Sequence, residues 1–410
     1  MKKEIPISTP VIRGNEWKYI KECLDSGWVS STGEYVRRFE SCVAGYLGSR
    51  YAVATVNGTA ALHVSLVACG VQAGEEVIVP AVTFVATANA VRYCNADPVF
   101  MDCDPRTFCI DIKKTARFLR EKTRIGNDGF TYNIRSGKRI AAVIPVHVFG
   151  HPADMDELVR VCSDRKIDII EDATESLGSV YKGKKTGTFG RCGCLSFNGN
   201  KIITTGGGGM VVTDDEKIAS RVRHLTTQAR TDSFEYYHDE IGYNYRLTNI
   251  QAAMGVAQME KLDEYIKIKR DNARLYRRLL SGLDKVELIW EDTPTVKSNF
   301  WFYTIRLPRG CKKPLMKYLT TMGIQVRSVW NPINTLPMYR RYMSYRVEHA
   351  VEVYETCINV PCSVDLKESD IHRVVSTIAS FFAKERLSRR VSKEQICLGR
   401  KAVVNAGSIL

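Results

Sequence analysis

Two residues in the middle of the chain have the types needed for imine chemistry. Asp172 lies in the apolar run IDIIEDATES, and Lys201 follows twenty-nine residues later, at the end of SFNGNK. An acid at the carboxyl end of a buried parallel strand lies where open α/β sheets bind their ligands. A lone Asp in such a place can equally cap a helix, so Asp172 by itself leaves both roles open.

Lys201 is flanked by apolar and glycine-rich chain, with no charged neighbour on either side. This context indicates an internal lysine, because burial disfavours the ammonium form and lowers the pKa of the amine. A neutral amine can form a Schiff base with a carbonyl compound. The surroundings of Lys201 are therefore typical of a lysine used in covalent catalysis.

The segment 57–62 (NGTAAL) follows a predicted strand and opens a predicted helix. Gly58 would permit close approach of a ligand to the backbone, and Thr59 adds a hydroxyl beside the free N–H groups of the helix start. Alone, such a segment is more often a plain helix cap. A phosphate anchor, an acid and an imine-forming amine are, together, what pyridoxal phosphate requires.

Short apolar runs alternate with helical stretches from about residue 50 to 213. These elements must position Asp172, Lys201 and the segment 57–62. The alternation predicts an α/β domain, and the near-continuous apolar character predicts a mostly parallel sheet covered on both faces. We expect strands at 52–56, 76–79, 98–102, 140–146, 167–171, 194–197 and 210–213, and helices at 60–69 and 155–166. Gly70 would end the first of these helices.

The rest of the chain predicts a second unit. The polar stretch 124–138 is typical of an inserted surface loop. A long helix is predicted from near Leu247, with a strand at 300–307 and a helix at 314–322 beyond it. The predicted organisation is a large domain at 1–255, a linker helix with a small α+β domain at 256–383, and a basic, disordered tail at 384–410.

Composition narrows the class of protein. The 410 residues are 44% hydrophobic and 25% charged, which excludes wholesale disorder, collagen and coiled coil. No apolar run is long enough to span a membrane and the first ten residues lack a signal-peptide core, so we expect a cytoplasmic protein. The net charge of +14 suits nucleic acid, an anionic membrane or a nucleotide diphosphate and does not choose among them. The thirteen scattered cysteines include no CxxC, which predicts reduced thiols and no metal site.

From about residue 5 to 380 the chain resembles the DegT/StrS-type nucleotide-sugar aminotransferases, pyridoxal-phosphate enzymes of fold type I. The segments that carry the resemblance, in the order of the family, are 27–40 (GWVSSTGEYVRRFE), 57–66 (NGTAALHVSL), 75–91 (EEVIVPAVTFVATANAV), 145–158 (PVHVFGHPADMDEL), 171–179 (EDATESLGS), 196–213 (SFNGNKIITTGGGGMVVT) and 241–255 (IGYNYRLTNIQAAMG). The resemblance implies a large domain with a mostly parallel sheet between helices and a small C-terminal α+β domain.

The resemblance also assigns roles. Lys201 would be the Schiff-base lysine, and Asp172 the acid on the pyridine nitrogen of the cofactor. The remaining cofactor contacts it implies are Thr59 and Ser196 with the backbone of Gly58 and Ala60 at the phosphate, Phe84 stacked on the ring, and Asn244 reaching the phosphate of the neighbouring subunit. Asn244 therefore implies a homodimer with shared active sites.

Three residues keep open roles. Glu175 stands where many members have Gln beside the phenolic oxygen of the cofactor, so its carboxylate is protonated, turned away or tuning the imine. Arg246 is a candidate for holding an anionic substrate or is structural. His147, at a strand end, is a candidate substrate residue or a core histidine.

The implied activity is transfer of an amino group from L-glutamate to the C4 keto group of a nucleotide-linked 4-keto-6-deoxy sugar, without nucleic-acid or membrane partners. The motif around Lys201 and the inserted stretch 124–138 favour UDP-4-keto-6-deoxy-N-acetylhexosamine as substrate, with GDP-4-keto-6-deoxymannose as the alternative. Sugar dehydratases of the family carry His in place of the lysine, so Lys201 argues against dehydration. The intact set of cofactor residues argues against a non-catalytic regulatory or nucleic-acid-binding role.

Overall fold

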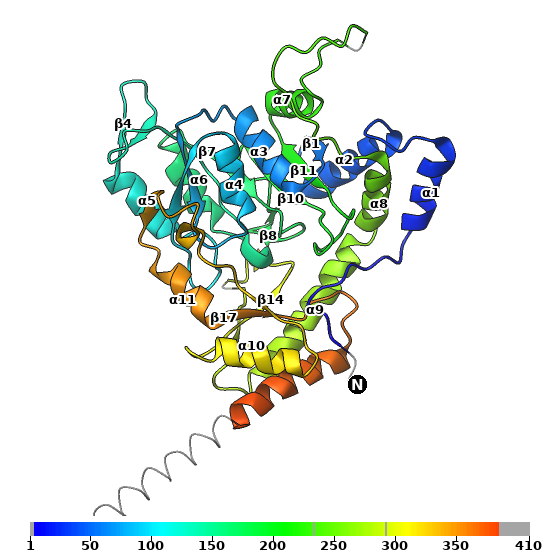
Figure 1. Ribbon diagram of the computed structural model, residues 1–410, viewed down its shortest axis with the longest axis vertical. Coiled ribbons are helices and arrows are strands. Elements are labelled where there is room, and N and C mark those ends of the chain that lie inside the picture. Colours follow the sequence, from blue (N-terminus) through cyan, green and yellow to red (C-terminus); the bar gives the residue numbers. More distant parts are fainter. Residues whose placement is uncertain (1–3, 233, 292, 385–410) are drawn as a thin grey trace, which may run out of the picture.

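The seven predicted strands and one strand from the C-terminal half form an eight-stranded sheet in the computed structural model, which describes residues 4–232, 234–291 and 293–384 (Figure 1). Its strand order is β1 (Tyr51–Thr55), β11 (Gly209–Thr213), β10 (Cys192–Ser196), β7 (Asp168–Asp172), β6 (Ile140–Val143), β2 (Glu76–Pro80), β3 (Asp97–Met101) and β16 (Ser344–Tyr345). Only β11 runs antiparallel to its neighbours. The predicted mostly parallel α/β sheet is confirmed.

Side chains of the central strands alternate between two apolar cores. Leu195 and Met210 pack into one core, whereas Cys194 and Val211 pack into the other. Because successive residues of a strand point to opposite faces, the sheet is buried on both sides. The helices around it are α1 (Glu16–Ser26), α2 (Glu34–Leu47), α3 (Gly58–Ala68), α4 (Ala86–Tyr93), α5 (Ile112–Glu121), α6 (Met155–Ser163), α7 (Glu216–Thr226) and α8 (Asn249–Met259).

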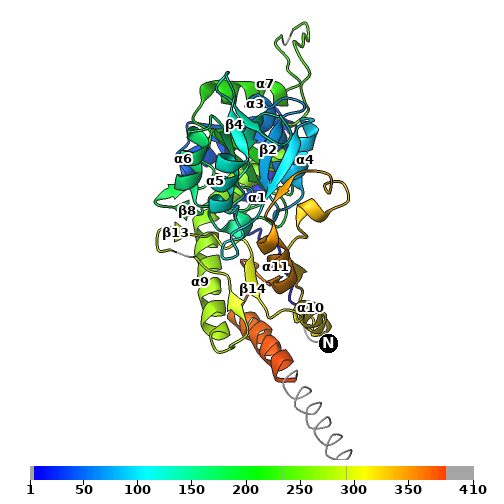
Figure 2. The same ribbon diagram turned by 90° about the vertical axis from the view of Figure 1, so that its left-hand side faces the viewer.

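The long helix predicted from Leu247 is two helices. The first, α8, begins at a capping box in which the Thr248 and Gln251 side chains bind each other's backbone N–H, and the second is α9 (Leu262–Leu280). Val256 and Tyr265 pack into the same core on either side of the break. The apolar period therefore continues through the break and does not reveal it. In both views α9 leads from the large sheet to a smaller one (Figures 1 and 2).

The smaller sheet is four-stranded and antiparallel. Its order is β12 (Glu287–Leu288), β14 (Tyr303–Arg306), β17 (Cys357–Val360) and β15 (Arg327–Ser328), with α10 (Lys312–Thr321), α11 (Glu348–Thr356) and a helix at 368–384 nearby. The strand predicted at 300–307 is therefore β14, and the helix predicted at 314–322 is α10. The boundary at residue 255 stays a prediction, and the predicted tail lies, from residue 385 on, outside the described residues.

The stretch 124–138 lies largely at the surface, as its polar composition predicts, but it is not an irregular loop. It contains most of a hairpin of β4 (Thr123–Ile125) and β5 (Thr131–Asn133). The buried Asn133 amide donates a 2.7 Å hydrogen bond to Glu76, and the Thr131 hydroxyl donates to the carbonyl oxygen of Arg165 at 2.7 Å. Polar side chains can be buried here because their hydrogen bonds are satisfied. The composition of the stretch does not reveal these hydrogen bonds. A further three-stranded sheet joins β13 (Val296–Lys297), β8 (Val180–Tyr181) and β9 (Lys184–Lys185).

Candidate active site

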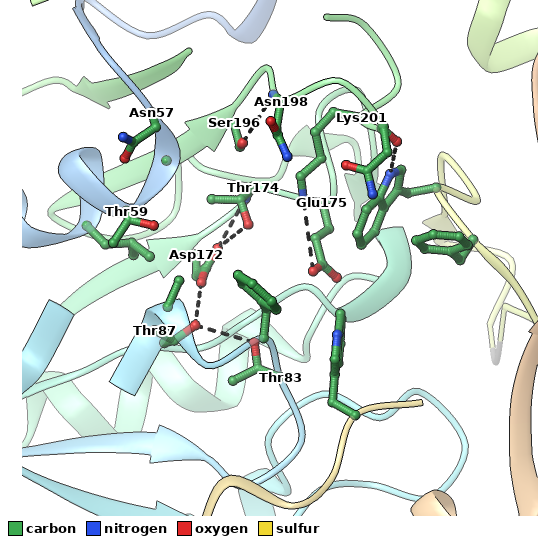
Figure 3. A pocket seen from close by; sticks show the side chains of 18 of the residues that line it. Asn57, Thr59, Thr83, Thr87, Asp172, Thr174, Glu175, Ser196, Asn198 and Lys201 are labelled. Carbon is green, nitrogen blue, oxygen red and sulfur yellow. Dashed lines mark hydrogen bonds and ion pairs between the residues drawn. The ribbon is translucent and has the colours of Figure 1, made fainter. Parts of the chain in front are cut away.

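A cavity of about 330 Å³ lies at the carboxyl ends of β7 and β10 (Figure 3). The large sheet contributes Asp172 and Ser196, which are the last residues of these strands, and the start of α3 contributes Gly58 and Thr59. The small sheet contributes residues of β15 and β17. The cavity is thus at the edge where parallel α/β sheets bind ligands, and the second sheet forms its other wall.

Asp172 is held by three hydrogen bonds. Its Oδ2 accepts from the Thr87 hydroxyl at 2.7 Å, and its Oδ1 accepts from the Thr174 hydroxyl at 2.7 Å and the Thr174 N–H at 3.2 Å. The side chain is buried, and these donors replace the water that burial removes. They also fix the orientation of the carboxylate in the cavity (Figure 3). The structure therefore uses Asp172 in the site and not as a helix cap.

Lys201 lies in the turn after β10, where its N–H donates to the carbonyl oxygen of Asn198 at 2.9 Å. Its Nζ is 3.9 Å from Oε1 of Glu175 and 3.8 Å from the ring centroid of Trp301. Burial lowers the pKa of Lys201, because the ammonium loses its hydration, while the carboxylates of Glu175 and Asp172 oppose the shift. The lysine is therefore internal, as its sequence context predicts.

Glu175 faces Lys201, which excludes one of the three roles considered for it. Its Oε2 accepts a 2.8 Å hydrogen bond from the N–H of Phe149, a residue in the left-handed region at φ +54°. Burial raises the pKa of Glu175 to about 7, although the charge of Lys201 acts in the opposite direction. Glu175 is thus not turned away from the lysine.

The start of α3 forms a cradle beside Ser196. A Cβ on Gly58 would come within 2.9 Å of the Ser196 Cβ and 3.1 Å of the Thr174 Cγ2, so the close approach requires glycine. The first N–H groups of a helix have no intrahelical partner and can bind an anion. The N–H of Ala60 is an exception, because it donates to the Asn57 side chain at 2.8 Å. The expectation that the Ala60 backbone binds phosphate needs correction, since Asn57 caps the helix with it.

Aromatic side chains line the remainder of the cavity. Phe84, predicted to stack on the cofactor ring, is 55% exposed and faces the cavity with its ring 6.5 Å from that of Trp330. Trp301 is held in place by its ring N–H, which donates to the carbonyl oxygen of Asn200 at 2.7 Å. An apolar wall of this kind suits a planar ring.

Four predicted residues do not line this cavity: Ala60, whose N–H caps the helix with Asn57, and three others. His147 is fully buried, with its Nε2 2.9 Å from Glu171 and its Nδ1 accepting from the N–H of Ala153 at 3.1 Å. It is a satisfied core histidine, and its assignment to substrate binding is wrong because no ring nitrogen is left for a ligand. Arg246 pairs with Glu40 at 3.2 Å, and Asn244 is exposed on the same segment.

Other cavity residues were not anticipated from the sequence. Asn57, Thr87 and Thr174 are of this kind, although all three lie within segments that carry the family resemblance. The small sheet and the segments next to it add Trp301, Phe302, Arg327, Ser328, Trp330 and Asn359. Only the packing of the two sheets brings these last residues to the cavity.

Comparison with known proteins shows the family of the chain. Residues 10–379 match the DegT/DnrJ/EryC1/StrS aminotransferase family, and the chain belongs to this family. GDP-perosamine synthase of Caulobacter vibrioides is 38% identical, over 91% of this chain and 97% of the relative, and that of Escherichia coli O157:H7 is 37% identical, over 93% and 99%. A DegT DnrJ EryC1 StrS aminotransferase from Brucella abortus has a crystal structure that is 26% identical, with a TM-score of 0.82, covering 90% of this chain and 95% of that one.

The chain is thus a sugar aminotransferase of a pyridoxal-phosphate-dependent family. The cavity fits this cofactor in the chemistry of its donors. Gly58 leaves room for a phosphate beside Ser196, Asp172 presents an oriented carboxylate, and Lys201 presents an internal amine. None of the helices in the described parts of the chain has the length and apolar character needed to cross a membrane.

Proposed function

We propose that this protein transfers an amino group from L-glutamate to the C4 keto carbon of GDP-4-keto-6-deoxymannose, in the biosynthesis of a surface polysaccharide. The observation that carries the proposal is the grouping of Asp172, Lys201 and the Gly58 cradle around one cavity. The choice of sugar is supported by the two GDP-perosamine synthases, which align with almost the whole chain.

The relatives therefore favour the alternative substrate over the UDP-linked sugar that the sequence suggested. That expectation depended partly on the stretch 124–138. None of its residues lines the cavity, and the segment forms a hairpin packed by Asn133 against Glu76. The hairpin gives no support for a particular nucleotide.

Amino-group transfer requires removal of a proton from a substrate carbon and a group that accepts the electrons left on that carbon. Pyridoxal phosphate, when bound, supplies an electron-accepting ring. The Nζ of Lys201 would take the proton from the substrate carbon and return it to the imine carbon of the cofactor. The lowered pKa of Lys201 makes the neutral amine available for this role. Asp172 would keep a proton on the ring nitrogen, and Thr87 and Thr174 hold it in the required orientation.

The other residues would bind and orient. The N–H groups of Gly58 and Thr59 and the hydroxyl of Ser196 would hold the phosphate, and Phe84 would cover one face of the ring. Glu175, whose Oε1 lies 3.9 Å from Nζ of Lys201, would tune the charge of the lysine. Asn244, which is exposed and does not line the cavity of its own subunit, would reach the phosphate site of a partner subunit in a homodimer.

Mass spectrometry of sugar nucleotides tests the proposal. Purified protein with pyridoxal phosphate and L-glutamate would be incubated in parallel with GDP-4-keto-6-deoxymannose and UDP-4-keto-6-deoxy-GlcNAc. We expect an amino sugar from the GDP substrate and none from Lys201→Ala. Conversion of only the UDP sugar would reject the choice of substrate and keep the aminotransferase activity, whereas conversion of neither would reject both substrates.

A further inference from the structure

Arg327 is a charged cavity residue that the chemistry above does not use. It lies on the edge strand β15, and its pairing with β17 places it opposite Asn359, which also lines the cavity. Its guanidinium makes no hydrogen bond or ion pair with the residues in the described ranges. By contrast, Arg306 on the neighbouring strand β14 contacts the carbonyl oxygen of Pro105 and lies 3.6 Å from Glu287.

The other three ionisable residues of the cavity already have partners. Asp172 accepts three hydrogen bonds, and Glu175 and Lys201 face each other at 3.9 Å. Arginine keeps its charge at all relevant pH values, and its planar fork matches a carboxylate or a phosphate. Arg327 is therefore the one lining charge, within the described part of the chain, that is free to meet an anionic ligand.

We propose that Arg327 is the residue that binds the anionic group of the substrate in this cavity. The inference rests on the proposed function, in which L-glutamate brings carboxylates and the sugar nucleotide brings a diphosphate. The reacting carbon of either substrate must approach Lys201, which belongs to the wall formed by the large sheet. The anionic end then extends toward the wall formed by the small sheet, which is where Arg327 lies.

The test uses Arg327→Gln and Arg327→Lys in the full chain, with Arg309→Gln as the matched control. Arg309 is 72% exposed, belongs to the same part of the chain and does not line the cavity. The L-glutamate and keto-sugar half-reactions are followed separately by cofactor absorbance. In a third arm, calorimetry measures the binding of GDP to protein without cofactor. Because Arg327 is exposed and unpaired, we expect its variants to fold, which circular dichroism checks.

In Arg327→Gln we expect the concentration for half-maximal rate to rise about 10- to 100-fold in at least one half-reaction, since a charged hydrogen-bond pair is lost. Arg327→Lys should show a smaller rise and the control none. A rise confined to L-glutamate identifies the carboxylate as the ligand, and a rise with the sugar together with weaker GDP binding identifies the diphosphate.

Unchanged values in all three arms, with an active wild-type enzyme, would overturn the role of Arg327 and leave the proposed function standing. If the wild type does not aminate the GDP sugar but its L-glutamate half-reaction depends on Arg327, the proposed substrate fails and the role of Arg327 stands. The two failures are therefore distinguishable.

Discussion

Replacing Glu175 by Gln tests the electrostatics of the site directly. The change keeps the size of the side chain but removes the carboxylate that lies 3.9 Å from the Nζ of Lys201. An anion at this distance favours the ammonium form of the lysine. Burial lowers the pKa of Lys201 and the Glu175 carboxylate opposes this shift. Without that carboxylate, the pKa of Lys201 must fall further below its ordinary value.

The distance sets the size of the effect. Two unit charges 3.9 Å apart attract by about 4 kcal/mol at an effective dielectric constant of about 20, which is a ceiling of about 3 on the pKa change. Glu175 itself has a pKa of about 7, so it carries its full charge only above that pH. We therefore expect the pKa of Lys201 to fall in the variant, by less than this ceiling.

The assay is acetylation of Lys201 by acetic anhydride in cofactor-free protein over a range of pH, quantified by mass spectrometry. Only the neutral amine reacts, so the midpoint of the rate profile reports the pKa. Glu157→Gln is the control, because Glu157 pairs with Arg160 at 2.6 Å and does not line the cavity. A midpoint that stays unchanged or rises in Glu175→Gln, with the control at the wild-type value, would refute this account of the lysine.

Three further predictions concern binding and assembly. Gly58→Ala should weaken pyridoxal-phosphate binding while the secondary structure is retained, because the added Cβ would come within 2.9 Å of Ser196 and 3.1 Å of Thr174. Fluorescence titration measures the affinity for the cofactor, and an unchanged affinity would contradict the role of the Gly58 cradle. Thr87→Ala should reduce cofactor affinity about 10-fold, because Asp172 loses a charged hydrogen bond. Thr83→Ala should not, because the Thr83 hydroxyl contacts the hydroxyl of Thr87 and not Asp172; equal effects of the two variants would contradict this role of Thr87. Mixing Lys201→Ala with Asn244→Ala subunits should restore part of the activity if Asn244 serves the neighbouring site, and no recovery in mixed dimers would argue against sharing.

The sequence predicted the parts of the fold that depend on local patterns. The strands of the large sheet are short apolar runs because both of its faces are buried, and the structure places them where the runs occur. The errors fall where local pattern and packing diverge. The hairpin of β4 and β5 buries polar groups through hydrogen bonds, and the break between α8 and α9 leaves the apolar period intact.

By itself the sequence determined which residues stand at the strand end, in the following turn and at the helix start: Asp172, Lys201 and Gly58. Strand ends of neighbouring parallel strands meet at one edge, so these positions predict a common site. Only the tertiary structure decided that Glu175 faces Lys201, that His147 is enclosed in the core, and that the small sheet supplies the opposite wall. The physical reason is that these contacts join segments far apart in the chain. Their distances depend on how the sheets and turns pack, which no local spacing of residues encodes.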